Sequence, residues 1–87
     1  MSSKAEKSHM DKVANAGCIV CRLHLGVFSP ATCHHVLKNG RRDDMRVLGL
    51  CGAHHQTGGR GVALHPYWKL WEELYGTQEE LLNQEIL

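Results

Sequence analysis

Large apolar side chains recur at helical spacing near the end of the chain. The spacing predicts a helix over residues 66–76, with Pro66 in its first turn and Gly76 at its end. This helix carries Tyr67, Trp68, Trp71, Leu74 and Tyr75. Thr77 and Glu80 form a capping-box pattern that predicts a last short helix, with Leu81, Leu82 and Ile86 on it.

Two short runs in the middle of the chain are compatible with β-strands. Residues 31–37 and 46–50 flank a polar, glycine-containing stretch over 38–45, which predicts a hairpin with a long loop. Residues 18–30 lack a period and are expected to form a turn that binds metal, followed by a loop. Residues 51–56 are expected to begin a helix that three glycines soon end: Gly58, Gly59 and Gly61.

Near the start of the chain, Ser8 and Asp11 resemble an N-cap pair. They predict a short helix that ends near Ala16, where Gly17 suits a left-handed stop. The expected organisation is a single domain over residues 1–87. It consists of an N-terminal helix (1–16), a metal-stabilised α+β core (17–65) and C-terminal helices (66–87).

Composition indicates how so small a domain is stabilised. A chain of 87 residues buries only about 60% of its unfolded surface, so its core is marginal. Seven histidines and four cysteines are more than a packed core requires, and they indicate metal binding. Long apolar runs and a secretory signal are both absent from the sequence, so we expect a cytoplasmic protein with no membrane contact. In a reducing cytosol, such clusters indicate metal rather than disulfides.

The net charge of +1 is an average over two unlike parts. Residues 1–65 contain nine Lys or Arg and four acids, a balance of +5. Residues 66–87 contain Lys69 and five glutamates, a balance of −4. The body of the chain is therefore basic and its end is acidic.

The strongest chemical signal is a pair of two-residue spacings. Cys18-x-x-Cys21 is followed by Cys51-x-x-His54, and two such turns supply the four ligands of a closed structural zinc site. Zinc binding can contribute roughly 10 kcal/mol to folding. Two disulfides are the alternative, and His24 is a weaker candidate ligand because it follows Cys21 at the same spacing.

When His54 is assigned to zinc, further histidines remain without a role: His34, His35, His55 and His65. Neighbours on a helix differ in direction by about 100°, so His55 is expected to face a different centre from His54. Strict alternation would send His34 and His35 to opposite faces, unless the strand ends or twists there. One of the two could then bind a metal with His55 while the other accepts a proton from water. Cys33 is expected to be buried filler rather than a ligand.

In this order, the motifs resemble the HNH, or ββα-metal, nuclease superfamily in its zinc-containing form. The resemblance rests on the two spacings above, on Thr32-Cys33-His34-His35-Val36, and on His54-His55 after Cys51. In particular, the chain resembles phage-type RecA-dependent nucleases known as Ref. That likeness is carried by the run from Asp44 to His55, the glycine-rich segment that leads to His65, and the ending around Tyr75-Gly76.

The resemblance implies a ββα-metal core with a structural zinc and flanking helices, and it implies roles for single residues. His35 would be the general base, while His34 and His55 would bind one catalytic divalent ion, Mg²⁺, Mn²⁺ or another. His65 is a weaker candidate, for a third ligand or for a contact with the leaving group, and Asp44 would orient a histidine or contact the metal. The usual superfamily pattern has an asparagine five residues before the second metal-binding turn, where this chain has Arg46.

The expected substrate is DNA, cut with weak sequence specificity. A set of basic side chains on or near the hairpin is expected to hold the phosphate backbone: Lys38, Arg41, Arg42, Arg46 and Arg60. The resemblance implies a role in recombination with a RecA filament as partner, in a bacterial or phage-infected cell. The alternative is a zinc-stabilised module that binds nucleic acid or protein and has lost the chemistry. Oligomeric state and strand preference are left open.

Overall fold

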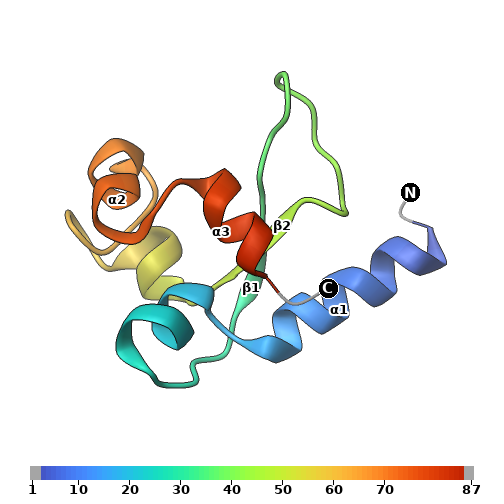
Figure 1. Cartoon of the computed structure of the whole chain (residues 1–87), viewed down its shortest axis with the longest axis horizontal. Coiled ribbons are helices and arrows are strands. Elements are labelled where there is room, and N and C mark those ends of the chain that lie inside the picture. Colours follow the sequence, from blue (N-terminus) through green and yellow to red (C-terminus); the bar gives the residue numbers. More distant parts are fainter. Residues whose placement is uncertain (1–2, 86–87) are drawn as a thin grey trace.

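A small α+β arrangement of helices around a two-stranded antiparallel sheet emerges from the computed structural model, which describes residues 3–85 (Figure 1). Seven elements follow one another along the chain: α1 (Lys4–Ala16), η1 (Cys21–Leu25), β1 (Thr32–His35), β2 (Val47–Leu50), η2 (Ala53–Thr57), α2 (Trp68–Tyr75) and α3 (Gln78–Gln84). The short elements η1 and η2 are single π-helical turns. The predicted α+β class is therefore confirmed.

The first helix begins earlier than predicted. Ser3, rather than Ser8, is the N-cap, and its side chain accepts a hydrogen bond from the backbone N–H of Glu6 while the Glu6 carboxylate accepts one from the backbone N–H of Ser3. This reciprocal capping box satisfies two backbone N–H groups at the start of the helix. Ser8 and Asp11, the predicted cap, lie inside α1 instead. The predicted end at Ala16 is confirmed, and Gly17 has a φ of 85°.

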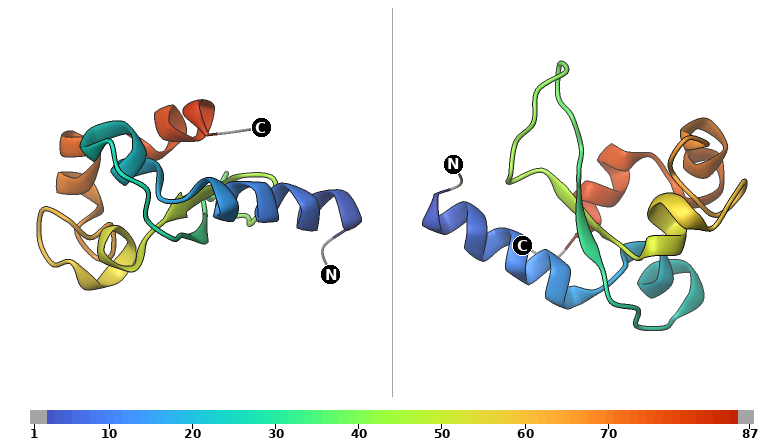
Figure 2. Two further views of the ribbon diagram at one scale, coloured as in Figure 1. Left: turned by 90° about the horizontal axis from the view of Figure 1, so that it is seen from below. Right: turned by 180° about the vertical axis from the view of Figure 1, so that it is seen from behind.

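The two strands form the hairpin expected from the sequence; β1 is shorter than predicted at both ends, whereas β2 begins one residue late and ends at Leu50 as predicted. Thr32 lies opposite Leu50 and His35 lies opposite Val47. The loop between the strands projects from the body of the molecule (Figure 2). At its tip, the backbones of Lys38 and Arg41 exchange two hydrogen bonds of 3.0 and 3.1 Å. The residues between them, Asn39 and Gly40, both have positive φ, as a tight two-residue turn requires.

The hydrophobic core lies where the helices meet the hairpin. All four residues of β2 are buried, α1 packs along both strands, and α3 packs on β2. Two of the four cysteines, Cys18 and Cys21, are part of this core. The proposed metal site therefore adjoins the hydrophobic core. The buried apolar side chains are Val13, Cys18, Ile19, Val20, Cys21, Val36, Val47, Leu48, Leu50, Ala63, Leu64, Trp71 and Leu81.

The C-terminal helices agree with the predicted pattern, with one shift. α2 begins at Trp68, two residues after Pro66, and ends before Gly76 as predicted. The capping box of Thr77 and Glu80 at the start of α3 is confirmed. Leu81 is fully buried, whereas Ile86, which was expected on the same helix, lies outside the described residues. Across residues 3–85, every helix is too short and too polar to cross a membrane.

Two glutamates of the acidic end fold back onto the basic body. Glu85 accepts hydrogen bonds from Arg22 at 2.6 Å and from the backbone N–H of Gly49 at 2.9 Å. Glu79 forms an ion pair with Arg46, which also donates to the carbonyl of Val36 at 3.4 Å. The opposite charges of the two parts of the chain are therefore partly neutralised inside the fold.

Candidate metal centres and active site

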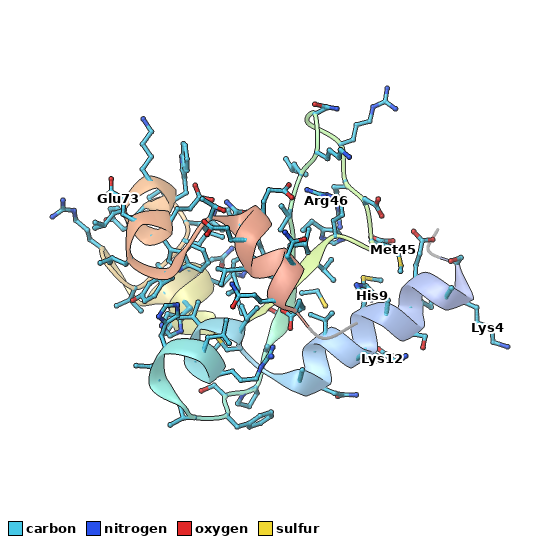
Figure 3. All side chains as sticks on the ribbon, in the orientation of Figure 1. Lys4, His9, Lys12, Met45, Arg46 and Glu73 are labelled. Atoms are coloured by element: carbon cyan, nitrogen blue, oxygen red, sulfur yellow. The ribbon has the colours of Figure 1, made fainter. Side chains whose placement is uncertain are left out.

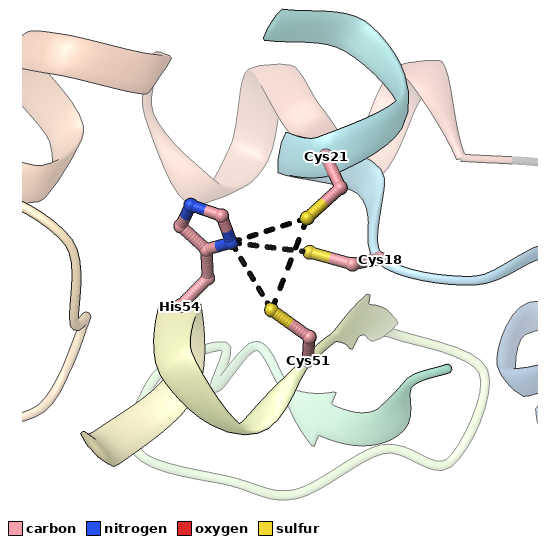
Figure 4. A group of neighbouring side chains, drawn as sticks. All are labelled: Cys18, Cys21, Cys51 and His54. Carbon is pink, nitrogen blue, oxygen red and sulfur yellow. Dashed lines mark hydrogen bonds between the residues drawn. The ribbon is translucent and has the colours of Figure 1, made fainter. Parts of the chain in front are cut away.

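The four residues of the two Cys/His spacings converge on one point (Figure 4). Cys18 lies just before η1 and Cys21 is its first residue, Cys51 follows β2, and His54 lies on η2. Nδ1 of His54 is 3.6 Å from Sγ of Cys18, 3.5 Å from Sγ of Cys21 and 3.1 Å from Sγ of Cys51. The sulfurs of Cys21 and Cys51 are 3.9 Å apart.

These separations fit the edges of a tetrahedral zinc site. Zinc bonds of about 2.3 Å to sulfur and about 2.0 Å to nitrogen place two sulfurs about 3.8 Å apart, and a sulfur and a nitrogen about 3.5 Å apart. A disulfide would need sulfurs about 2.05 Å apart, and all four cysteines are free. The cluster can therefore hold a metal ion such as zinc.

Burial of the cluster shifts the pKa values of its ligands. Burial is the main cause that raises the pKa of the Cys18 thiol to about 11, and the neighbouring Cys51 adds to it. Burial also lowers the pKa of His54, so its imidazole stays neutral and able to donate a lone pair. A bound divalent ion supplies the positive charge that would make thiolates favourable in such surroundings.

The two remaining candidates for this cluster lie elsewhere. His24 Nε2 is 3.1 Å from the backbone carbonyl oxygen of Tyr75, and its ring packs edge-on against the Tyr75 ring. Cys33 donates its thiol hydrogen to the carbonyl of Met10 on α1, at 3.3 Å. Cys33 is therefore a partly buried residue that joins β1 to α1, as expected of a side chain that binds no ion.

A second group of possible ligands is formed by His34, His55 and His65. Their ring centroids lie 5.1–5.2 Å from one another, so the three imidazoles form a nearly equilateral triangle. His34 comes from β1 and His55 from η2, while His65 lies on the segment that returns alongside η2. Backbone hydrogen bonds from Leu64 to His54 and from His65 to His55, of 2.9 and 3.0 Å, hold that segment in place. We call these three residues the histidine trio.

Two members of the trio are held in the neutral form that a metal requires. Burial is the main cause that lowers the pKa of His34, and the nearby His55 and His65 lower it further, although a hydrogen bond to Gln78 opposes the shift. Burial, followed by the proximity of His65, also lowers the pKa of His55. His34 Nε2 lies 2.9 Å from Oε1 of Gln78, so Nε2 carries the hydrogen and Nδ1 keeps a free lone pair.

His35, the residue after His34 on β1, is paired with Asp44. Nε2 of His35 lies 2.7 Å from Oδ1 of Asp44, on the loop before β2. Nη2 of Arg42 lies 3.4 Å from Nδ1 and 3.5 Å from Nε2 of the same ring. His35 and the histidine trio line one cavity of about 680 Å³. Both adjacent histidines of β1 thus reach one cavity at the point where the strand ends.

Three of the predicted phosphate-binding residues gather at the hairpin loop. Lys38, Arg41 and Arg42 line an open groove of about 970 Å³ between this loop and the start of α1. Arg42 also lines the cavity of the histidine trio, so its side chain borders both the groove and the cavity. The groove also contains three acids: Glu6, Asp43 and Asp44.

The two other predicted arginines are not in this group. Arg46 is largely buried and is engaged by Glu79 and by the Val36 carbonyl, so it is not available to a phosphate as it stands. In Figure 3, Arg46 is seen at the base of the hairpin loop. Arg60 lies on the segment between η2 and α2, which Figure 1 shows well away from the hairpin loop.

Two residues that line the cavity were not identified from the sequence as site residues. Gln78 binds His34 from the first turn of α3, a contact over 44 residues that local spacing cannot signal. Trp68 lines the cavity from α2 and is 50% exposed. Trp68 and Trp71 belong to the same predicted helix, and only the phase of α2 against the core separates the exposed ring from the buried one.

The fold and the two clusters define a small α+β protein with a Cys/His group that can hold a metal ion and a second histidine group beside it. The family model described as "Recombination enhancement, RecA-dependent nuclease" matches residues 2–86, almost the whole chain. The chain therefore belongs to this family, whose name implies a nuclease with a link to RecA. No curated protein and no solved structure matches the chain.

Proposed function

We propose that this protein is a metal-dependent DNA endonuclease of the HNH, or ββα-metal, type. The observation that carries the proposal is the shared cavity, which is lined by three histidines that could hold a metal ion and by a fourth histidine paired with a carboxylate. Family membership supports the reaction class, since a nuclease hydrolyses phosphodiester bonds. The order of a hairpin followed by a short helical turn supports the ββα-metal assignment.

The structural ion in this proposal is zinc, bound by Cys18, Cys21, Cys51 and His54. Three thiols and one imidazole are a donor set typical of closed structural zinc sites. Their separations agree with a tetrahedron, and three of the four residues are buried. The ion would connect η1 to η2 across a core that is small for a chain of this length.

The histidine trio would hold the catalytic divalent ion. Nδ1 of His34 is available because Nε2 is bound to Gln78, and His55 and His65 offer one ring nitrogen each. When bound, such an ion stabilises negative charge on the phosphate and on the leaving oxygen. An all-imidazole set suits transition metals better than Mg²⁺, which prefers oxygen ligands.

His35 would act as the general base. In the neutral ring, Nε2 donates its hydrogen to Asp44, so the lone pair on Nδ1, which lies 3.4 Å from Nη2 of Arg42, is the one that would accept a proton from water. The Asp44 carboxylate fixes the orientation of the ring and stabilises the imidazolium that proton transfer creates. Asp44 would therefore be a positioning residue rather than a metal ligand.

The DNA backbone would approach along the hairpin loop. Lys38, Arg41 and Arg42 are exposed there, and Arg42 extends to the edge of the cavity. Contacts of this kind hold phosphates without reading bases, so binding should weaken as salt rises. The family description supports a link to RecA, and we propose that a RecA filament on DNA is the partner that presents the substrate.

The experiment is a cleavage assay with zinc-reconstituted protein on single- and double-stranded DNA. Each substrate is tested with Mg²⁺, Mn²⁺ or no added ion, with and without a RecA filament. We expect His35→Ala to abolish cutting and Asp44→Asn to reduce it by about 100-fold or more, because the imidazole then loses its carboxylate. His24→Ala, which removes an exposed histidine remote from the cavity, is the matched control.

Two results would contradict this proposal. If wild type and His35→Ala cut equally, the general base is wrongly assigned. If the wild type cuts under none of these conditions, the chain is a zinc-stabilised binding module instead.

A further inference from the structure

Two tryptophans of the same short helix lie in opposite environments. Trp71 is fully buried in the core, whereas Trp68, one turn earlier on α2, is 50% exposed. An indole ring is a large, rigid apolar surface with a polar N–H, and its exposed part is available for contact with a ligand.

The position of Trp68 points to the ligand. Its side chain lines the cavity that contains the histidine trio, together with the apolar residues Leu37 and Leu64. Trp68 is only three residues beyond His65 along the chain. The cavity of about 680 Å³ is within the range of sites that bind small organic groups, and it is larger than one nucleotide needs.

The charge around the indole also suits a nucleotide. Nζ of Lys69 lies 5.6 Å from the centroid of the Trp68 ring, so a positive charge accompanies the aromatic surface. Arg42 adds a second positive charge to the lining of the cavity. A flat aromatic ring beside cations is the combination that proteins use to hold a base by stacking and its phosphate by charge.

We propose that Trp68 stacks against a nucleobase next to the scissile phosphate, so that the substrate of the cavity is a strand with an unpaired base. The inference rests on the proposed nuclease function and specifies the substrate of that site. A base inside a duplex has both faces covered by its neighbours and cannot also stack on a protein ring. Stacking on one ring also accepts any base, in agreement with weak sequence specificity.

The test compares the binding of two oligonucleotides that differ only in their bases. Zinc-reconstituted protein, with no added magnesium or manganese, is titrated with dT12 and with a 12-nucleotide strand in which every site is abasic. Fluorescence anisotropy of a labelled strand gives the dissociation constants. The variants are Trp68→Ala, Trp68→Phe and Leu74→Ala, the last being a control at an equally exposed apolar position of α2.

We expect the wild type to bind dT12 about 5- to 150-fold more tightly than the abasic strand, the range that stacking of one base gives. Trp68→Ala should bind both strands alike, with unchanged affinity for the abasic strand. Trp68→Phe should keep most of the preference, and Leu74→Ala should keep all of it. The emission of the buried Trp71 reports whether each variant is folded.

Failure of this inference is distinguishable from failure of the nuclease function. If the wild type shows no preference for dT12, or if folded Trp68→Ala retains the full preference, the stacking role is refuted even when the protein cuts DNA. If the preference depends on Trp68 but the protein never cuts, the nuclease function is refuted and the stacking site stands. A preference lost equally in Leu74→Ala would also overturn the assignment, because it would not be specific to the indole.

Discussion

The contact between Glu85 and Arg22 gives the most quantitative prediction about stability. The Glu85 side chain is fully buried and serves two donors, the Arg22 guanidinium and the backbone N–H of Gly49. It thereby connects the C-terminal end of α3 to the start of η1 and to β2. Glu85→Ala would remove both hydrogen bonds and leave a cation without its partner.

The magnitude follows from the burial of the two groups. Removing one partner of a buried ion pair costs about 3–5 kcal/mol, and the Arg22 side chain is still 28% exposed, which favours the lower end. We therefore expect Glu85→Ala to lower the free energy of unfolding by about 3 kcal/mol. Glu85→Gln keeps an oxygen acceptor for Gly49 and should lose only about 1–2 kcal/mol.

Urea unfolding followed by circular dichroism, at a fixed concentration of zinc, measures these changes. Glu73→Ala is the control, since it removes the same charge from an exposed position on α2. An effect of Glu85→Ala within about 0.5 kcal/mol of that control would refute the reasoning. It would mean that the contact forms without stabilising the fold.

Three further predictions concern the metal sites and the turn between them. Cys18→Ser should unfold the domain, since about 10 kcal/mol of zinc binding is at stake, whereas Cys33→Ser should stay folded; circular dichroism distinguishes them. The pKa values of His34 and His55 are lowered, chiefly by burial, so these two rings take up protons at a lower pH than an exposed imidazole does. Calorimetry should therefore show Mn²⁺ affinity that falls as the pH drops and protons displace the ion, and an affinity independent of pH down to about pH 5 would contradict this. Gly58→Ala should destabilise the protein by about 1–3 kcal/mol in urea unfolding, because a Cβ there would lie 2.5 Å from a backbone carbonyl; an unchanged midpoint would be inconsistent with the turn described.

Features written in short stretches of sequence could be predicted. The capping box of Thr77 and Glu80 was identified because both partners lie within one turn, and the hairpin because two β-compatible runs flank a polar loop. The first helix was placed too late because Ser3 and Glu6 form the same kind of pattern as Ser8 and Asp11 do. Local patterns of equal quality cannot decide which of two caps the rest of the fold uses.

Contacts between residues that are far apart in the sequence could not be predicted from local patterns. Arg46 was counted as a phosphate-binding residue, but Glu79, 33 residues later, forms an ion pair with it. The same holds for Gln78 and its contact with His34. Charge counting by segment did reveal a basic body and an acidic end. It could not reveal that the end folds back and neutralises part of the body, because this depends on the path of α3.

The turn η2 carries ligands of both proposed ion sites on consecutive residues. His54 belongs to the cysteine cluster and His55 to the histidine trio, while backbone hydrogen bonds tie the segment that carries His65 to the same turn. The two sites therefore share one rigid piece of backbone and should be thermodynamically linked. Filling the cysteine cluster would raise the affinity of the trio for its ion by some factor, and filling the trio would raise the affinity of the cluster by the same factor. A larger ion in the cluster, such as cadmium, would shift η2 and so change the spacing of the trio, which makes the choice of structural metal a means of tuning the second site.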